Sequence, residues 1–341
     1  MSFDAAYLRH SLPSLAEAAQ APTVIEGQSG GLGDYIELYK LDKCIELTSA
    51  YHCGILETTG YSVAVQVFQV ASARATVTVL HGYFDHVGLY RHVITRLLSF
   101  GFNVVAFDLP GHGLSSGARA AVRSFDEYRL VFDSVIEHCR QLFPAVAALP
   151  QFAVGQSTGG AILLEHLLTS LSRTPFQHCV LLAPLVRPRA WEKAKLLFSL
   201  IGRYRDYWPR QWNLNSHDES FHNFIKNCDP LQPRQVNARW VEALIDWIPR
   251  TEAARPGALE RARQNLPGIT ILQGSDDATV EWEHNLPVIE TLFPWARSIV
   301  IPDARHHLVN ESVLYRDRVF NLMEEALEAS LRQAEQQPVR Q

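Results

Sequence analysis

The sequence lacks the usual signs of a membrane-spanning or secreted protein. It has no run of 18 or more apolar residues, so no transmembrane helix is expected. Its N-terminus has no basic start followed by an apolar core, which argues against a secretory signal. Both absences favour a location in the cytoplasm.

Paired cysteines are also missing. The five cysteines are odd in number, scattered along the chain and never spaced as Cys-x-x-Cys: Cys44, Cys53, Cys139, Cys179 and Cys228. This pattern argues against a disulfide framework or a zinc site and for a reducing compartment. No other pattern in the sequence calls for a metal or an organic cofactor, so we expect a cytoplasmic protein that works without either.

The chain has only a small excess of charge. Its 31 Lys and Arg residues against 36 Asp and Glu give a net charge of -5, which argues against general nucleic-acid binding. Hydrophobic residues make up 47% of the chain, an ordinary value for a globular protein. With 341 residues the chain exceeds the size at which one hydrophobic core usually stops growing. We therefore expect one large domain that carries an insertion, or two domains.

Short apolar runs alternate with helical patterns along most of the chain. The runs expected to form strands are residues 63–70, 75–80, 102–107, 152–154, 179–182, 269–272 and 297–301. The helical patterns are residues 88–100, 125–142, 158–172, 282–293 and 311–334. Strands that alternate with helices form a mainly parallel sheet covered on both faces. The sequence therefore predicts an α/β fold whose core has two parts, residues 49–184 and 266–335.

The alternation breaks between about residues 185 and 265. This stretch is rich in Trp, Tyr, Phe and Arg and shows no strand pattern, so we expect a mainly helical insertion. Ligands of open parallel sheets bind beyond the carboxyl ends of the strands. An insertion that leaves the strand near Leu181 would lie over that edge as a cap. Residues 1–48 precede the core as a poorly patterned leader.

A candidate nucleophile lies where a predicted strand meets a predicted helix. Residues 155–159 read Gly-Gln-Ser-Thr-Gly, with an apolar run before them and apolar residues at helical spacing after them. This arrangement is typical of a nucleophile elbow, in which a strained turn exposes Ser157 above a helix N-terminus. Residues 113–117 match the same Gly-x-Ser-x-Gly pattern, but they follow a turn-rich stretch and precede no helix. We predict that this second copy is a structural loop.

A serine hydroxyl needs a base and a carboxylate to become a nucleophile. In α/β-hydrolases these groups follow the serine along the chain in the order acid, then histidine. Asp276 and Asp277 come directly after one predicted strand, and His306 and His307 come directly after the next. We therefore predict a Ser–Asp–His triad at the carboxyl edge of the sheet, with Ser157 as its nucleophile.

An oxyanion hole is the fourth part expected. Acyl transfer creates a negative oxygen that needs preorganised N–H donors. One donor comes from the residue after the nucleophile, Thr158, and the other from the loop after an earlier strand. There Gly82 lets the chain turn, which makes the backbone N–H of Tyr83 the second candidate. His81 is expected to brace this loop through hydrogen bonds rather than act as a base.

The motifs together resemble one family. They are similar to the motif set of the monoacylglycerol lipase and lysophospholipase branch of the α/β-hydrolases, also labelled serine aminopeptidase S33-like. The resemblance extends over roughly residues 50–330. It is carried by residues 81–82, 108–117, 155–160, 274–280 and 306–311.

The resemblance assigns the triad residue by residue. The family's Gly-x-x-Asp-x-x-Val pattern falls on residues 274–280, which implies that Asp277 is the acid, with Asp276 as the alternative. The family's His-Glu-Leu-x-Asn-Glu falls on residues 306–311, which implies that His306 is the base. His307 departs from the family, which often has Glu there. The elbow serine argues against haloalkane dehalogenases and epoxide hydrolases, which carry Asp at that place.

The cap combines basic and aromatic side chains. Residues 187–210 hold seven Lys or Arg against two acidic residues, interleaved with large apolar side chains. Such a mixture suits an anionic lipid surface, and it equally suits a lid helix that covers the pocket while its charges stay solvated. An apolar roof favours an acyl chain as substrate. The residues predicted to contact the substrate are Trp191, Phe198, Tyr207 and Trp208.

These expectations lead to one preferred function and two alternatives. The preferred function is a serine carboxylic ester hydrolase acting on a monoacyl lipid, such as a monoacylglycerol or lysophospholipid, through an acyl-enzyme on Ser157. The first alternative is an aminopeptidase or amidase with the same triad. The second is a non-catalytic ligand-binding protein of the hydrolase fold.

Overall fold

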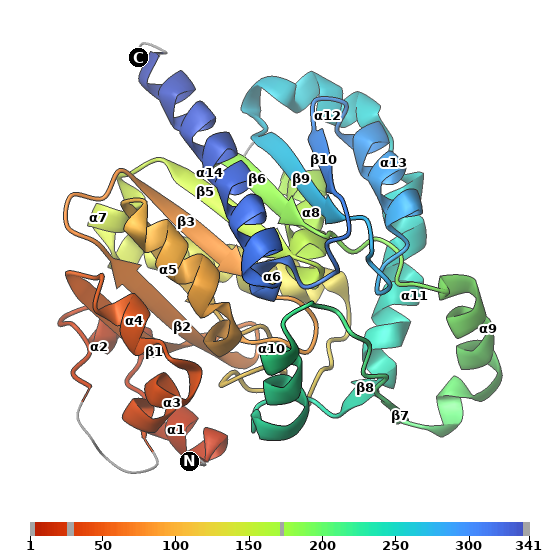
Figure 1. Cartoon of the computed structure of the whole chain (residues 1–341), viewed down its shortest axis with the longest axis horizontal. Helices are drawn as coiled ribbons and strands as arrows, with labels where there is room; N and C mark the ends of the chain where they lie inside the picture. The colour runs from red at the N-terminus through yellow and green to blue at the C-terminus, as the bar shows by residue number, and fades with distance from the viewer. Residues whose placement is uncertain (1–3, 26–30, 171–173, 337–341) are drawn as a thin grey trace.

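The central feature of the computed structural model is an eight-stranded sheet (Figure 1). The structure describes residues 4–25, 31–170 and 174–336. The strands lie in the order β1-β2-β4-β3-β5-β6-β9-β10. β2 is antiparallel to both β1 and β4, and every other neighbouring pair is parallel. Their bounds are β1 Ala50–Thr58, β2 Tyr61–Gln69, β3 Ala75–Leu80, β4 Phe102–Phe107, β5 Gln151–Gln156, β6 Phe176–Leu182, β9 Gly268–Gly274 and β10 Arg297–Ile301.

The central strands are apolar on both faces because both faces are covered. Every residue of β3 and β4 is buried. Along β4, Phe102 and Val104 belong to one hydrophobic cluster, whereas Val105 and Phe107 belong to the other. Neighbouring residues of a strand point to opposite faces, so the continuous apolar run requires a layer on each side. The predicted mainly parallel α/β fold is confirmed.

Helices form these two layers (Figure 1). The layer in front of the sheet contains α5 (Arg91–Ser99) and α14 (Val313–Gln336), whose apolar residues share the first cluster. The second cluster holds buried residues of α6 (Phe125–Leu142), α8 (Thr158–Ser170) and α13 (Trp282–Leu292). The short α7 (Pro144–Ala147) precedes β5. No helix in the described ranges is long and apolar enough to cross a membrane.

The N-terminal segment is more ordered than its weak pattern suggests. Its described part forms α1 (Ala5–Ser11), α2 (Leu15–Ala18), α3 (Leu32–Tyr39) and α4 (Asp42–Ile45), while residues 1–3 and 26–30 of the predicted leader lie outside the described residues. Leu15 and Tyr35 are buried in the two clusters. A Cβ on Gly54 of β1 would come within 2.9 Å of Leu15 Cα. The helices are short, which gives too few turns for a clear periodicity.

The stretch between β6 and β9 contains mostly helices and one small ribbon. The ribbon pairs β7 with β8 in antiparallel fashion, and the absence of a strand pattern had predicted none. Three-residue strands are too short to show a period of two. The elements are α9 Trp191–Ile201, β7 Tyr207–Pro209, α10 Glu219–Asn223, β8 Gln235–Asn237, α11 Ala238–Ala253 and α12 Pro256–Ala262.

The two halves of this stretch pack differently. α11 lies against the core, where the fully buried Trp247 stacks on Phe125 at 4.3 Å and donates to Glu165. α9 instead projects at the edge of the molecule, and most of its side chains are exposed (Figure 1). The stretch is therefore not one uniform unit.

Candidate active site

Ser157 occupies a strained turn between β5 and α8. Its φ of 53° is left-handed, a conformation that is costly for a residue with a side chain. A Cβ on Gly155 would lie 2.6 Å from the Gly159 backbone, and one on Gly159 would lie 2.5 Å from the Leu80 carbonyl. Only glycine fits at these two positions. This is the strand–turn–helix context of a nucleophile elbow, and it places the serine at the helix N-terminus, where it lines a pocket.

The second Gly-x-Ser-x-Gly copy is a structural loop, as predicted. Ser115 Oγ donates to the Asp108 carbonyl at 2.6 Å and accepts from the Ala64 N–H at 3.0 Å. The Asp108 carboxylate accepts from the N–H groups of Val87 and Leu114, both at 2.7 Å. Ser115 is therefore used to join this loop to β2 and is not poised for chemistry.

The structure pairs His306 with Asp277. His306 Nδ1 lies 2.7 Å from Asp277 Oδ2, and both side chains are buried. Asp277 also accepts from Gln273 and from the Thr279 N–H. Burial alone would raise the pKa of the Asp277 carboxyl, but His306 and the hydrogen bonds outweigh burial and lower it. The carboxylate thus stays ionised and holds the His306 proton on Nδ1, which leaves Nε2 to accept another.

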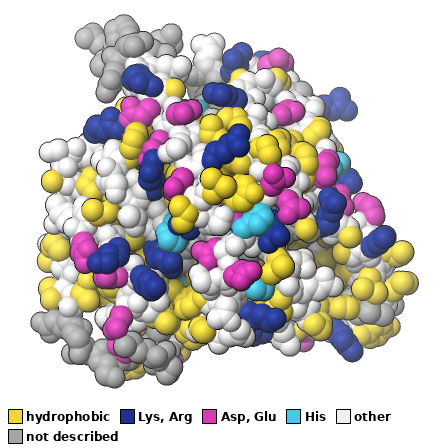
Figure 2. Space-filling model, viewed as in Figure 1, with side chains coloured by type: hydrophobic (Ala, Val, Ile, Leu, Met, Phe, Trp, Pro, Cys, Tyr) yellow, Lys and Arg dark blue, Asp and Glu magenta, His cyan; other side chains and the backbone are white. Residues whose placement is uncertain are grey.

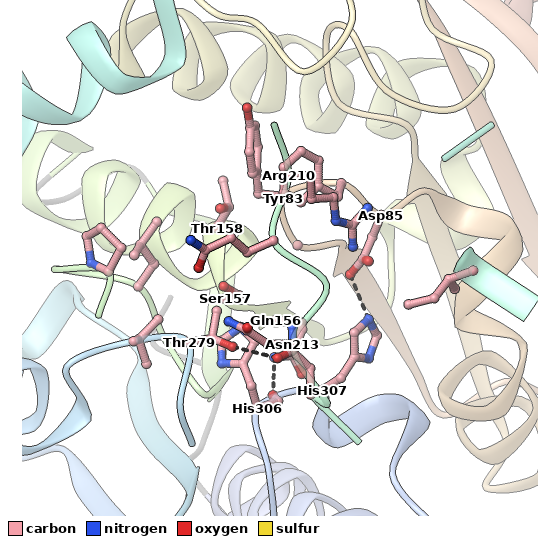
Figure 3. A pocket seen from close by; sticks show the side chains of 18 of the residues that line it. Tyr83, Asp85, Gln156, Ser157, Thr158, Arg210, Asn213, Thr279, His306 and His307 are labelled. Atoms are coloured by element: carbon pink, nitrogen blue, oxygen red, sulfur yellow. Dashed lines mark hydrogen bonds and ion pairs between the residues drawn. The ribbon is translucent and has the colours of Figure 1, made fainter. Parts of the chain in front are cut away.

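The two alternatives within each pair separate clearly. Asp276 is exposed and lies 3.3 Å from the Arg305 guanidinium, away from His306. His307 Nε2 lies 3.0 Å from Asp85 Oδ2 instead of facing Asp277. The geometry therefore favours Asp277 and His306 for the triad. Ser157 lines the same pocket as both histidines (Figure 3).

A buried chain of contacts holds the loop after β3. The Tyr90 hydroxyl accepts from the Gly82 N–H at 2.9 Å and donates to Asp85 at 3.0 Å. Gly82 passes close to the nucleophile, since a Cβ there would lie 3.5 Å from Ser157 Cβ. Asp85 in turn meets His307, so the loop with Tyr83 is tied to the loop with the catalytic histidine candidate. Sequence reasoning missed this role of Asp85, although it comes only three residues after Gly82.

His81 braces this loop, as expected. Its Nδ1 lies 2.8 Å from the Gly82 carbonyl, and its Nε2 accepts from the Leu109 N–H at 2.9 Å. Burial lowers the pKa of His81, so the ring is neutral with one donor and one acceptor. Both ring nitrogens are occupied by backbone groups, which leaves neither for acid–base work.

Tyr83 and Thr158 line the pocket beside Ser157, where the two oxyanion donors were predicted (Figure 3). The Tyr83 ring stacks on Trp240 of α11 at 3.7 Å. Its hydroxyl donates to the Ala120 carbonyl at 2.8 Å. The stretch between β6 and β9 therefore helps to fix the loop whose N–H groups would face the oxyanion.

The pocket around Ser157 encloses about 140 Å³. Its walls combine apolar side chains with amides and one arginine. The apolar ones include Leu185, Ile225, Trp240 and Val280, and the polar ones include Arg210, Gln211, Asn213, Asn215 and Thr279.

The four aromatic residues predicted to contact the substrate do not line this pocket. Trp191 is buried within the second hydrophobic cluster and anchors the start of α9. Tyr207 is 44% exposed, and Phe198 and Trp208 are partly exposed. Phe198 lies on the outward-projecting α9, and Tyr207 and Trp208 lie on β7, so their contact with a substrate stays a prediction. The aromatic walls come from Tyr83, Phe84, Trp212 and Trp240 instead.

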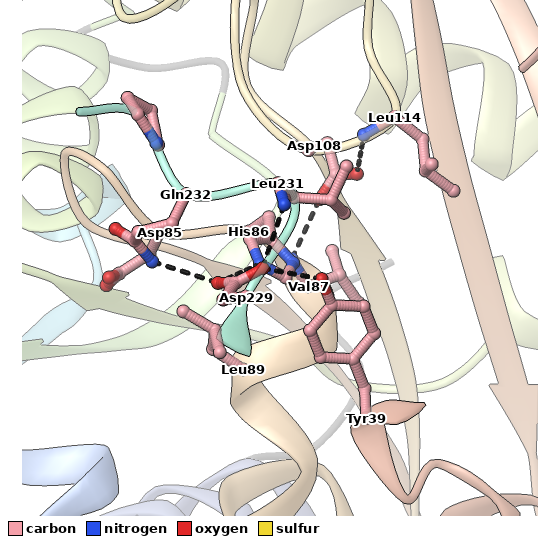
Figure 4. A network of polar contacts seen from close by, with 12 residues as sticks. Tyr39, Asp85, His86, Val87, Leu89, Asp108, Leu114, Asp229, Leu231 and Gln232 are labelled. Atoms are coloured by element: carbon pink, nitrogen blue, oxygen red, sulfur yellow. Dashed lines mark hydrogen bonds and ion pairs between the residues drawn. The ribbon is translucent and has the colours of Figure 1, made fainter. Parts of the chain in front are cut away.

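A second buried polar cluster lies behind the loop after β3 (Figure 4). Asp229 accepts from the Tyr39 hydroxyl at 2.6 Å and lies 3.0 Å from His86 Nε2. It also accepts from Gln232 and from the Leu231 N–H. Burial would lower the pKa of His86, but Asp229 outweighs burial and raises it. The cluster joins α3, the loop after β3 and the segment after α10.

Within the described ranges, no group of three or more His, Cys, Asp or Glu side chains is placed to hold a metal ion. The site's chemistry is therefore argued from the side chains named above.

Comparison with known proteins agrees with this geometry. Residues 71–313 match the family described as Serine aminopeptidase, S33. The chain belongs to this hydrolase family. The match begins after β2, so the N-terminal helices lie outside it.

Two curated relatives and one solved structure illustrate the similarity. An abhydrolase domain-containing protein of Dictyostelium discoideum is 34% identical over 189 residues, which is 52% of this chain but only 19% of that protein. Mouse monoglyceride lipase is 26% identical over 247 residues, 70% of this chain and 77% of the lipase. A Saccharomyces cerevisiae monoglyceride lipase structure has a TM-score of 0.68 at 17% identity, covering 81% of this chain and 94% of that one. That structure shows the α/β-hydrolase fold alone.

Proposed function

We propose that this chain is a serine carboxylic ester hydrolase that cleaves a monoacyl lipid through an acyl-enzyme on Ser157. The observation that carries the proposal is the 2.7 Å contact between Asp277 and His306 in the pocket that also holds the strained Ser157. A histidine oriented by a buried carboxylate next to an elbow serine is the arrangement that acyl transfer requires.

The reaction follows from the position of each group. Ser157 Oγ attacks the ester carbonyl while its proton passes to His306 Nε2, and Asp277 stabilises the imidazolium that forms. The N–H groups of Tyr83 and Thr158 stabilise the negative oxygen of the tetrahedral intermediate. The C–O bond then breaks, and His306 gives its proton to the departing alcohol. Water activated by His306 attacks the acyl-enzyme in the same way and releases the carboxylic acid and free Ser157.

A monoacyl lipid is the substrate class that the relatives and the pocket support together. The mouse relative is named a monoglyceride lipase, and the pocket has an apolar wall for an acyl group. About 140 Å³ compares with an engineered cavity of roughly 150 Å³ that holds benzene. A long acyl chain would therefore extend beyond this pocket.

The outward-facing helix α9 supports peripheral contact with a lipid surface. Leu196 and Leu200 are each 63% exposed, and Lys193 and Lys195 lie on the same helix. Hydrophobic side chains and Lys or Arg gather at this edge of the molecule (Figure 2). Exposed leucines beside cations suit insertion between anionic head groups.

The five free cysteines, four of them buried, are in keeping with a cytoplasmic location.

The ester is favoured over the amide of an aminopeptidase. A peptidase that binds a free amino terminus needs an unpaired carboxylate in its pocket. Among the described residues that line the pocket, the only carboxylate is Asp85, and it is already paired with His307. Comparing p-nitrophenyl esters with aminoacyl anilides would separate the two activities. Faster anilide cleavage would replace the ester proposal by the amide one.

A fluorophosphonate probe tests the nucleophile directly. We expect it to label Ser157, and Ser157→Ala should abolish both labelling and hydrolysis of p-nitrophenyl esters from C2 to C16. Ser115→Ala is the matched control because Ser115 has the same local sequence pattern but a structural role. Labelling or hydrolysis that persists in Ser157→Ala would overturn the assignment. Tight lipid binding without turnover in the wild type would favour the non-catalytic alternative.

A further inference from the structure

One cation lies in the pocket that the proposed mechanism does not use. Residues 210–215, called the strap here, connect β7 to the segment before α10. All of them except Leu214 line the pocket. Arg210 is the only Lys or Arg among the described residues that do so, and Figure 3 shows it beside Tyr83 and Asp85.

Neutral groups hold the Arg210 guanidinium in place. Its carbon lies 4.1 Å from the ring centroids of both Phe84 and Trp212. Nη1 donates to the Pro233 carbonyl at 3.1 Å and to Gln232 Oε1. Gln232 is itself fixed, because its amide nitrogen donates to the buried Asp229 at 3.0 Å. The guanidinium is thus preorganised between two rings and two oxygens.

The rest of the guanidinium has no protein partner in the described part of the chain. Nε and Nη2 donate no hydrogen bond to described residues, and no described Asp or Glu lies within 4.0 Å of the group. An arginine presents these two nitrogens side by side, in a geometry that matches two oxygens of a carboxylate or phosphate. The unused edge is therefore suited to an anion.

The charge of this subsite favours an anion as well. Burial lowers the pKa of Arg210 to about 10, so the side chain stays cationic at neutral pH. The nearest lining carboxylate, Asp85, is bound by His307 and Tyr90, each at 3.0 Å. Asp85 therefore offsets Arg210 only at longer range. Burying part of a cation without an ion pair costs free energy, and a bound anion would offset that cost.

The strap contacts the loop that carries the proposed catalytic base. At its far end the Asn215 carbonyl accepts from the His307 N–H at 2.8 Å, and the Asn215 amide oxygen accepts from Thr279. His306, the neighbour of His307, must deliver its proton to the leaving oxygen. An alcohol that leaves from His306 toward the strap would meet the strap's amides and Arg210, which line the same pocket.

We propose that Arg210 binds an anionic group, a phosphate or a carboxylate, on the alcohol part of the substrate. The enzyme then takes an acidic monoacyl lipid of the lysophospholipid type in preference to a neutral monoacylglycerol. This inference rests on the proposed ester hydrolase function and names the head group for the same site.

Matched esters with one acyl chain test the head group. The probes are 1-octanoylglycerol, its 3-phosphate and the octanoyl ester of glycerate, each kept below the concentration at which it aggregates. We expect wild-type kcat/KM to be higher for the acidic esters. Arg210→Gln should lower kcat/KM for the preferred acidic ester roughly 10- to 100-fold more than for the neutral ester, the usual effect of losing hydrogen bonds to a charged group. Arg210→Lys should restore part of the preference.

Arg234→Gln is the matched control. Arg234 packs over the same Trp212 ring at 5.4 Å but does not line the pocket, so its removal should leave the ratio of acidic to neutral ester unchanged. Inorganic phosphate gives a second measurement. It should competitively inhibit neutral-ester hydrolysis by the wild type and much less that by Arg210→Gln.

The outcomes distinguish failure of this inference from failure of the proposed ester hydrolase function. An equal loss on acidic and neutral esters in Arg210→Gln, or no wild-type preference, would show that Arg210 only braces the strap, and would overturn the inference alone. A preference for phosphate over carboxylate, or the reverse, identifies the head group. If the wild type cleaves none of the three esters, or if Ser157→Ala cleaves them equally well, the proposed function itself fails.

Discussion

Two regions meet at the pocket, but they are built differently. One consists of the strand ends that carry Ser157 and Asp277, and the other is the strap, which carries Arg210. The first are ends of buried strands whose positions are set by backbone pairing on both sides. The strap has no regular secondary structure and is held by contacts of Arg210 with Phe84, Gln232 and Pro233 and by the hydrogen bond from the His307 N–H to Asn215. The proposed chemistry, which needs fixed geometry, lies at the sheet, while the proposed contacts that select a substrate lie on a loop.

The largest effect should come from the acid on the sheet. Asp277→Asn keeps the shape of the side chain but no longer holds His306 in the required tautomer, so we expect kcat to fall by about 10⁴. Asp276→Asn is the control, because Asp276 is exposed and contacts Arg305 instead. Initial rates with a p-nitrophenyl ester measure both variants. Similar losses in the two variants would contradict the assignment of the acid.

Two glycine substitutions should compare the crowded elbow with an open position in a helix. Gly155→Ala places a methyl 2.6 Å from backbone at the elbow, so we expect a loss of about 1–3 kcal/mol in the free energy of unfolding, with reduced activity. Gly257→Ala in α12 meets only the end of Arg261 at 3.8 Å. That variant should be more stable than the wild type by roughly 0.5–1 kcal/mol. Urea unfolding checks both, and a tolerated Gly155→Ala would show that the elbow is not constrained as described.

Acid should remove the stabilisation that two buried carboxylates, Asp277 and Asp229, give to the folded protein. Burial raises the pKa of Asp229 and of Asp277, but their histidine partners and hydrogen bonds outweigh it, so both pKa values lie below the ordinary one. Their stabilisation is complete above the unfolded pKa of about 3.9 and is lost as the pH falls through the lower folded values. Wild-type stability should therefore drop below about pH 4.

Asp229→Asn isolates one of these groups. The variant should be less stable than the wild type at pH 7, because His86 loses its charged partner, and its stability should depend less on pH below 4. Denaturant unfolding at pH 7, 5 and 3.5 gives the comparison. A variant with the same acid dependence as the wild type would show that Asp229 remains protonated or unpaired in the folded protein.

The smallest effect on the folded protein should come from α9. Replacing the exposed Leu196 and Leu200 by Ser should change the free energy of unfolding by less than about 0.5 kcal/mol. Sedimentation with anionic phospholipid vesicles should show weaker association, while hydrolysis of a soluble ester is unchanged. Leu314→Ser is the control, since Leu314 is 76% exposed on α14. Equal vesicle binding by the wild type and the α9 variant would remove α9 as the contact.

Local motifs predicted the strand ends that carry the proposed triad much better than the stretch between β6 and β9. The elbow, Asp277, His306 and the bracing role of His81 each depend on a few consecutive residues after a strand, and parallel strand ends meet at one edge. Composition placed four aromatic residues of α9 and β7 at the pocket, but composition does not specify the direction in which α9 projects. Its outward direction depends on where Trp191 is anchored, and no local pattern records that.

The sequence by itself determined the α/β alternation, the elbow at Ser157 and the order of serine, aspartate and histidine. These depend on backbone conformation and on residues close in the chain, whose constraints hold in any surroundings. Only the tertiary structure decided that Asp85 meets His307, that Tyr39 meets Asp229 across 190 residues, and that Arg210 enters the pocket with two nitrogens that donate to no described residue. Such contacts join segments far apart in sequence, and their partners are chosen by packing rather than by local preference.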